Sequence, residues 1–252
     1  MTKIDDFIFS GCSSLSSIVI PDNVISIGSG AFESCTNLSS IVIPDNVISI
    51  GSYAFAFCPN LSSIVIPDKV DEIALCTFSG CTGLKSIIIP DSVTSIGINV
   101  FSDCSSLSSI VLPDKVTKIG SGTFMGCTSL SSIVIPDNVT KIGNHTFWYC
   151  SSLISVVLPD NVTEIGSWAF EGCSSLSSIV IPDNVIRIDE QAFINCSSLV
   201  SVMCRPTIPP ALGTFVFYGN KSDCIIYVPE ASVDAYKSSW SSYASSIQAM
   251  TE

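Results

Sequence analysis

The strongest constraint on the fold of this chain is a repeat of fixed length. Leu15 and Leu38 are 23 residues apart, and the same step separates successive Phe, Cys and Pro-Asp positions along most of the chain. No insertion interrupts this period between Ile4 and Leu199. One unit of this size cannot bury its own apolar residues, whereas stacked units form a continuous core. The sequence therefore predicts a solenoid.

The first half of each repeat has the pattern of a short strand. In the repeat at residues 38–60, Ser40 to Ile43 is rich in β-branched residues and alternates with period two. Ile41 and Ile43 should face the core, and Val42 should face solvent. Pro44 lacks an N–H group and ends the strand. We expect the next residue, Asp45, to fold its carboxylate onto nearby backbone N–H groups in an Asx-type turn.

The second half of the repeat returns to the core. Val47 and Ile50 predict a second extended segment with inward-facing side chains. Gly51 supplies a turn, and Ala54 is expected to start a short helical or 3₁₀ stretch that ends near Cys58. Strands of neighbouring coils should pair at about 4.8 Å, with identical residues forming columns along the axis.

The repeated pattern Leu-x-x-Ile-x-Ile-Pro-x-x-Val-x-x-Ile-Gly-x-x-Ala-Phe-x-x-Cys resembles the BspA-like class of leucine-rich repeats, from residue 4 to about residue 199. The resemblance implies an α/β repeat solenoid. It implies a curved right-handed coil with parallel strands on its concave face and short helical or 3₁₀ turns opposite. It also implies a cell-surface or secreted protein, with adhesion to host or partner proteins as the commonest role.

The period defines the expected domains. A solenoid should cover residues 1–220, as a half repeat (1–14), eight full repeats (15–198) and a degenerate repeat (199–220). Because residues 2–12 match the second half of a repeat, we expect further sequence to precede them. A capping strand and helix should cover residues 221–252. In the cap, residues 224–228 are the expected last strand and residues 231–250 an amphipathic helix, with Val233, Tyr236, Trp240 and Ile247 on one face.

Composition excludes several classes of partner. The chain is 47% hydrophobic and 13% charged, with a formal net charge of −12. Nucleic acids and anionic membranes attract basic proteins, so neither is an expected partner. No apolar run reaches the roughly 18 residues of a membrane span. The closest basic grouping, Lys115, Lys118 and Lys141, is a weak signal.

Two columns invite a chemical interpretation, and a structural one suits both better. The Cys column is expected to hold buried free thiols that pack as small hydrophobes. Cys204 should lie in the core, and Cys76 is in a variable loop where exposure is expected. The Asp column offers one carboxylate per coil, far from the six to eight oxygens of a calcium site. His145, the only histidine, has no nucleophile motif around it. We therefore expect no enzyme activity, no metal and no cofactor.

Candidate binding residues lie in two places. The outward strand positions form a Ser column beside a Val/Ile column, and in the latter Val65, Ile88, Val111 and Val134 are candidates for contact with a protein. The second group is aromatic and lies at variable positions, where exposed Trp and Tyr are typical binding anchors. It consists of His145, Trp148, Tyr149 and Trp168, with a smaller pair formed by Tyr53 and Phe57. For the aliphatic column the alternative is strand propensity alone, and for the aromatic residues it is the covering of neighbouring loops.

These observations favour a non-enzymatic protein-binding or adhesion module. Its partner would be a protein ligand, such as a host or extracellular-matrix protein. The alternatives are a passive structural spacer and a segment that self-associates through the exposed strand edge of the first coil. Otherwise we expect a monomer.

Overall fold

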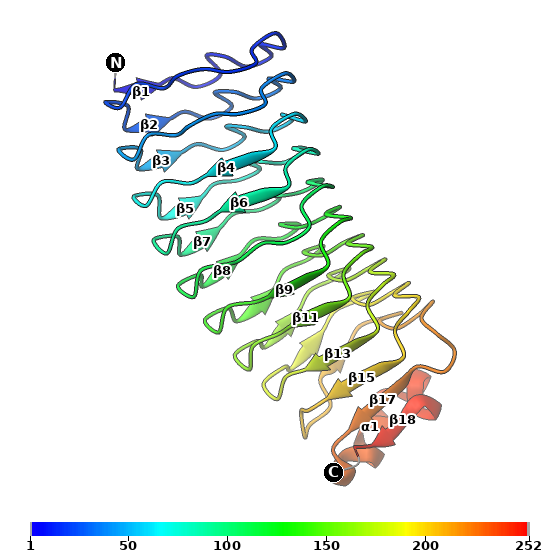
Figure 1. Ribbon diagram of the computed structural model, residues 1–252. Coiled ribbons are helices and arrows are strands. Elements are labelled where there is room, and N and C mark those ends of the chain that lie inside the picture. The colour runs from blue at the N-terminus through cyan, green and yellow to red at the C-terminus, as the bar shows by residue number, and fades with distance from the viewer. Residues whose placement is uncertain (1, 251–252) are drawn as a thin grey trace.

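The structure is a computed structural model that describes residues 2–250. Within them the chain winds as a parallel β-solenoid whose ends lie far apart (Figure 1). Each repeat forms one coil, because the strand register pairs residues 23 positions apart, such as Ser63 with Ser86 and Ile64 with Ile87. The solenoid predicted from the period is confirmed.

Each coil carries two extended segments. The first, which we call the long-strand face, contains β4 (Ser63–Val65), β6 (Ser86–Ile88), β9 (Ser132–Val134), β11 (Ser155–Val157), β13 (Ser178–Ile181), β15 (Ser201–Cys204), β17 (Ile225–Val228) and β18 (Ile247–Ala249). The second, the short-strand face, contains β1 (Lys3–Ile4), β2 (Ser26–Ile27), β3 (Ser49–Ile50), β5 (Glu72–Ile73), β7 (Ser95–Ile96), β8 (Lys118–Ile119), β10 (Lys141–Ile142), β12 (Glu164–Ile165), β14 (Arg187–Ile188) and β16 (Ala211–Leu212).

The long-strand face is not one continuous sheet. Its sheets are the pairs β4–β6 and β9–β11 and the four-stranded group β13–β15–β17–β18. Residues 109–112 hold the strand position between β6 and β9, yet they form no strand. Within the described residues, no backbone hydrogen bond joins them to either neighbour. The hydrogen-bond ladder is therefore open on both sides of Val111.

The core consists of columns of identical side chains. Phe rings stack from Phe9 to Phe217, with centroids 4.9 Å apart for Phe170 and Phe193 and 5.8 Å apart for Phe78 and Phe101. The Leu column from Leu38 to Leu199 is fully buried beside them. Burying each such side chain contributes roughly 1.5–3 kcal/mol, so stacking the coils stabilises the fold.

The third part of each coil is a turn segment, where a short helix was expected. In residues 52–58, Tyr53 and Phe57 have φ of 59° and 57°, which right-handed helices exclude. The N–H groups of Tyr53, Phe55 and Phe57 donate to carbonyls of the next coil, whereas that of Ala56 donates to Tyr53 within its own coil. The expected helical or 3₁₀ stretch is therefore wrong, since alternate N–H groups from Tyr53 to Phe57 form a ladder between coils.

The Pro-Asp turn also differs from its prediction. The N–H of Val47 donates to the carbonyl of Pro44 at 3.0 Å, and the same bond recurs in the other coils. Within residues 2–250 no backbone N–H group donates to a carboxylate of the Asp column, so the Asx-type turn is wrong. The ring of Pro44 already fixes φ for a turn, and the exposed Asp45 side chain remains in solvent.

The C-terminal cap is more irregular than the expected helix. It consists of η1 (Glu230–Ser232), α1 (Val233–Ser239), η2 (Ser241–Ser246) and then β18, which pairs in parallel with β17. Residues 225–228 are thus not the last strand. The buried Tyr236 hydroxyl and Trp240 indole donate to the carbonyls of Pro206 and Pro210, at 2.8 and 2.9 Å. These two bonds tie the cap to the Pro-rich loop, and of the predicted apolar face Tyr236, Trp240 and Ile247 are buried.

Candidate binding surfaces

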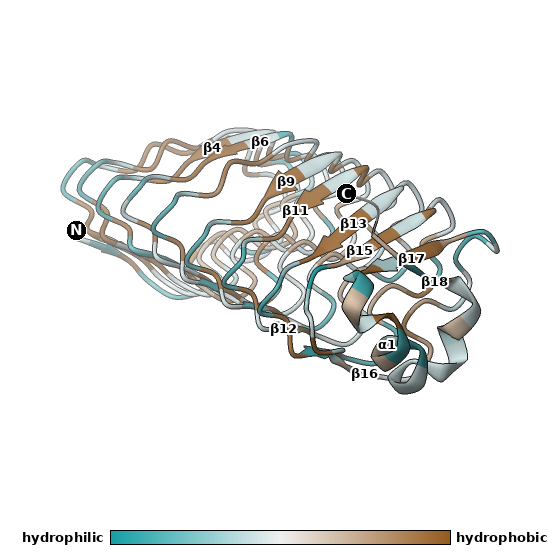
Figure 2. Ribbon diagram, turned by 90° about the horizontal axis from the view of Figure 1, so that it is seen from below, coloured by the Kyte–Doolittle hydropathy of each residue, from teal (hydrophilic) through white to brown (hydrophobic). Residues whose placement is uncertain are grey.

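An exposed aliphatic column follows the long-strand face through successive coils. Strand geometry places every second side chain outward, so the residue between two buried aliphatic residues points into solvent. Val111 is 83% exposed, for example, between the buried Ile110 and Leu112. We call this column the aliphatic ribbon, and Figure 2 shows hydrophobic residues along these strands. Its members are Val19, Val42, Val65, Ile88, Val111, Val134, Val157, Val180 and Met203.

Polar columns run along both sides of the aliphatic ribbon. Exposed serines, among them Ser86 and Ser109, precede it by two residues. Exposed aspartates, among them Asp91 and Asp114, follow it by three. Among the described residues, the ion pairs in the Asp column are limited to Asp160, which lies 3.8 Å from Arg205. The ribbon is therefore an apolar strip between a hydroxyl edge and an anionic edge.

Two hollows flank Val111 where the hydrogen-bond ladder is open. One, of about 340 Å³, is lined by Ile88, Val111, Ser86, Asp91 and their neighbours. The other, of about 370 Å³, is lined by Val111, Val134, Ser109, Asp114 and their neighbours. Both combine exposed aliphatic side chains with hydroxyls and one carboxylate. The interruption of the ladder, and hence this local relief, could not be read from a repeat that is nearly uniform in sequence.

The structure brings the predicted aromatic residues together in the turn segments of adjacent coils. The rings of His145 and Trp168 stack with centroids 5.0 Å apart, and Trp148 lies edge-on to Tyr149 at 4.4 Å. Both indole N–H groups are already satisfied. That of Trp148 donates to Glu171 at 2.8 Å, and that of Trp168 donates to Gln191 at 2.7 Å. Both indole donors of this cluster are therefore occupied within the chain.

The exposed rings of Phe57 and Tyr149 also have a structural role. Each occupies a left-handed position and leans over the next coil, where the equivalent residue is Gly80 or Gly172. A Cβ atom at Gly80 would lie 2.5 Å from Phe57, and one at Gly172 would lie 3.0 Å from Tyr149. A sequence signal existed for this packing. From Phe57 onward the column alternates between a larger residue and glycine.

Tyr53 and Phe57 do not form an aromatic pair of their own. The Tyr53 ring lies next to the Cys76 thiol, whose proximity raises the pKa of the phenol. Cys76 itself is buried, so its expected exposure is wrong. Cys76 occupies the left-handed position, with φ of 53°, that Tyr53 occupies one coil earlier, and the neighbouring Tyr53 side chain helps to cover its small thiol. Cys204 is buried as predicted.

The cysteine column confirms its structural interpretation. Every cysteine in it is free, and from Cys35 to Cys196 each is buried and donates its thiol to a Phe carbonyl of the preceding coil. Burial raises the pKa of Cys81 to about 12. A thiol nucleophile must be ionised at working pH, so these groups lack the property that nucleophilic catalysis needs. Within the described residues, no group of three His, Cys, Asp or Glu side chains is placed to hold a metal ion.

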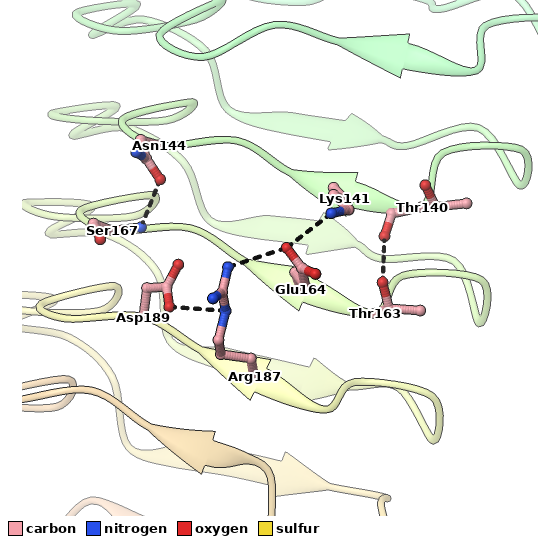
Figure 3. Close-up of polar contacts among 8 residues, drawn as sticks. All are labelled: Thr140, Lys141, Asn144, Thr163, Glu164, Ser167, Arg187 and Asp189. Carbon is pink, nitrogen blue, oxygen red and sulfur yellow. Dashed lines mark hydrogen bonds and ion pairs between the residues drawn. The ribbon is translucent and has the colours of Figure 1, made fainter.

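Three neighbouring outward residues of the short-strand face are charged and joined by ion pairs (Figure 3). Glu164 on β12 lies 3.1 Å from Lys141 on β10 and 3.2 Å from Arg187 on β14, and Arg187 also contacts Asp189. Lys141, part of the weak basic grouping with Lys115 and Lys118, is thus neutralised by a neighbour. The short-strand face is therefore a charged strand surface in the same chain, in contrast to the aliphatic ribbon on the long-strand face.

A further hollow, of about 460 Å³, lies where the solenoid meets the cap. Its lining includes the exposed Phe215 and Tyr218 together with Trp240, Tyr243 and several serines. The repeat decays there, so no sequence pattern predicted this hollow. No helix within residues 2–250 has the length and hydropathy of a membrane span.

The stacked coils, parallel strands and core columns define a leucine-rich-repeat solenoid. The model of the BspA type leucine rich repeat region (6 copies) matches residues 2–131 and 117–241. The chain therefore belongs to the BspA-type leucine-rich-repeat family, as the pattern indicated.

Two solved structures of bacterial proteins have a similar fold. A leucine rich repeat protein of T. pallidum is 32% identical, with a TM-score of 0.62, over 69% of this chain and 82% of that one. A leucine-rich repeat protein from Bacteroides ovatus is 26% identical, with a TM-score of 0.52, over 100% of this chain and 88% of that one. Among curated proteins, none matches significantly.

Proposed function

We propose that this chain is a non-enzymatic protein-binding module of a cell-surface or secreted protein, and that it binds through the aliphatic ribbon. The observation that carries the proposal is the length of the ribbon, from Val19 to Met203 without an interposed charge. Exposed apolar surface of this extent typically marks an interaction site. The family resemblance supports the surface location, an adhesive role and the placing of this face on the concave side of the solenoid.

A comparison within the chain supports a role for the ribbon beyond strand propensity. The short-strand face provides an internal comparison, because its outward positions are also strand positions of the same coils. From β1 to β14 the outward residue of each short strand is charged or a serine, and in β16 it is Ala211. If β-branched residues were favoured only for the backbone, both faces would be aliphatic. The difference indicates that the long-strand face has a use beyond forming strands.

The aromatic cluster is the second candidate surface. Tyr149 is 45% exposed, and aromatic anchors are common in interfaces. The satisfied indole groups and the packing of Tyr149 over Gly172 favour a structural role instead. The two surfaces lie on different segments of the coil, so they can be tested separately.

The experiment is an affinity screen against purified extracellular-matrix and serum proteins with the wild type and two variants. The ribbon variant is Ile88→Glu with Val111→Glu and Val134→Glu, and the cluster variant is Trp148→Ala with Trp168→Ala. We expect a protein that binds the wild type to bind the ribbon variant at least 10-fold more weakly. Its affinity for the cluster variant should equal its affinity for the wild type. Circular dichroism checks that both variants fold. Loss confined to the cluster variant, or no bound protein at all, would contradict the proposal.

A further inference from the structure

We propose that the two hollows flanking Val111 each bind a lysine or arginine side chain of a basic segment in the protein partner. This inference rests on the proposed function and specifies the chemistry of the partner. It starts from the lining of the hollows. Ile88, Val111 and Val134 supply aliphatic walls, while Asp91 and Asp114 supply one carboxylate to each hollow.

The shape of each hollow suits a side chain with an apolar stem and a charged end. Lysine and arginine bury their methylene groups along apolar surface and keep the cationic group in water. Here the stem would lie between Ile88 and Val111, or between Val111 and Val134, and the cation would reach the carboxylate at the rim. A purely apolar side chain would leave the carboxylate unpaired, and an acidic one would be repelled.

The charge around the hollows supports this choice of occupant. Asp91 and Asp114 are exposed, and within residues 2–250 neither has an ion-pair partner, Lys115 included. The chain has a formal net charge of −12. A basic segment would therefore be attracted over long range and paired locally, which raises both the association rate and the specificity.

The spacing of the hollows also fits a protein segment. The Phe rings of the coils that line them, Phe101, Phe124 and Phe147, lie 5.7 Å and 5.5 Å apart. Alternate side chains of an extended segment are separated by about 6.8 Å, and residues one turn apart on a helix by about 5.4 Å. Two basic side chains at either spacing reach both hollows, which share Val111 as their common wall.

The test uses the whole chain and a synthetic ten-residue peptide of alternating lysine and valine. Isothermal titration should detect binding of this peptide. It should not detect an analogue with acetylated lysines, and an analogue with the short-stemmed diaminopropionic acid should bind at least 3-fold more weakly. Equal binding of the acetylated or short-stemmed analogue would overturn the proposal, because charge and stem are both required. Failure of the lysine peptide to bind would also overturn it.

Paired variants locate the binding. Asp91→Asn with Asp114→Asn should weaken the lysine peptide about 3- to 30-fold, since two exposed ion pairs are lost. Asp22→Asn with Asp45→Asn removes the same charge from the same turn position in other coils and should change the affinity less than 2-fold. Equal losses for the two pairs would show general electrostatic attraction and overturn the assignment. If the peptide fails while a screened protein still depends on the ribbon, the hollow assignment fails and the proposed function stands.

Discussion

The packing of Phe57 over Gly80 gives a sharp test of how the turn segments are built. Gly80 has φ of +73°, where an alanine costs about 1–2 kcal/mol. Its Cβ would also lie 2.5 Å from Cδ1 of Phe57, so the ring must move. Phe57 is 49% exposed, and half of a Phe side chain corresponds to about 100 Å², or about 2 kcal/mol, as an upper limit. Alanine also lowers the conformational entropy of the unfolded chain, which offsets about 0.4–1 kcal/mol of this destabilisation. We expect Gly80→Ala to destabilise the protein by about 2 kcal/mol.

The assay is urea unfolding followed by circular dichroism, repeated in a Phe57→Gly background. Without the ring only the backbone strain remains, so Gly80→Ala should then cost about 0.5–1 kcal/mol. Gly11 provides a second control, because it has φ of +71° and a Cβ there would meet no atom within 4 Å. An equal cost of Gly80→Ala in both backgrounds would refute the steric part of the reasoning. Stabilisation by Gly80→Ala would refute both the steric part and the backbone-strain part of the reasoning.

Three further predictions concern the rest of the solenoid. Glu164→Gln removes the carboxylate between two cationic side chains and should reduce the unfolding free energy by about 0.5–1 kcal/mol in low salt, with little effect in 1 M NaCl. Tyr236→Phe should reduce the free energy of unfolding by about 1 kcal/mol in the same assay, because the carbonyl of Pro206 loses its donor. An unchanged free energy of unfolding would show that this bond does not stabilise the cap. Burial raises the pKa of Cys81 to about 12, above the unfolded value of about 8.5, so its contribution to stability is complete below pH 8.5 and falls as pH rises. Between pH 8 and 10.5 the Cys81→Ala variant should therefore lose about 2 kcal/mol less than the wild type, and identical losses would contradict the burial of the neutral thiol.

The period determined most of what was predictable. A fixed step of 23 residues allows few arrangements other than stacked coils, and the alternation at Ile41, Val42 and Ile43 set which side chains are inward. The aliphatic ribbon was predictable for the same reason. The inward Cys and Phe columns followed from residue type alone.

What sequence reasoning missed depends on contacts between coils. The N–H of Phe57 could donate within a helix or to the next coil, and local pattern does not decide between them. The open ladder at Val111 arises among repeats that are almost identical, so no residue there signals it. The cap departs from the expected helix after Ser239, and its last strand, β18, is formed by pairing with β17, a contact that the local pattern does not signal.

The most direct test of the central claim places a photoreactive benzoyl-phenylalanine at position 111 or at position 149. Val111 lies on the aliphatic ribbon and Tyr149 lies in the aromatic cluster, and both side chains are exposed. Irradiation with the protein recovered from the affinity screen should give a crosslinked product from the substitution at 111 and little from that at 149. Crosslinking at 149 alone would contradict the account, because it would place the partner on the turn segments and leave the aliphatic ribbon without a ligand.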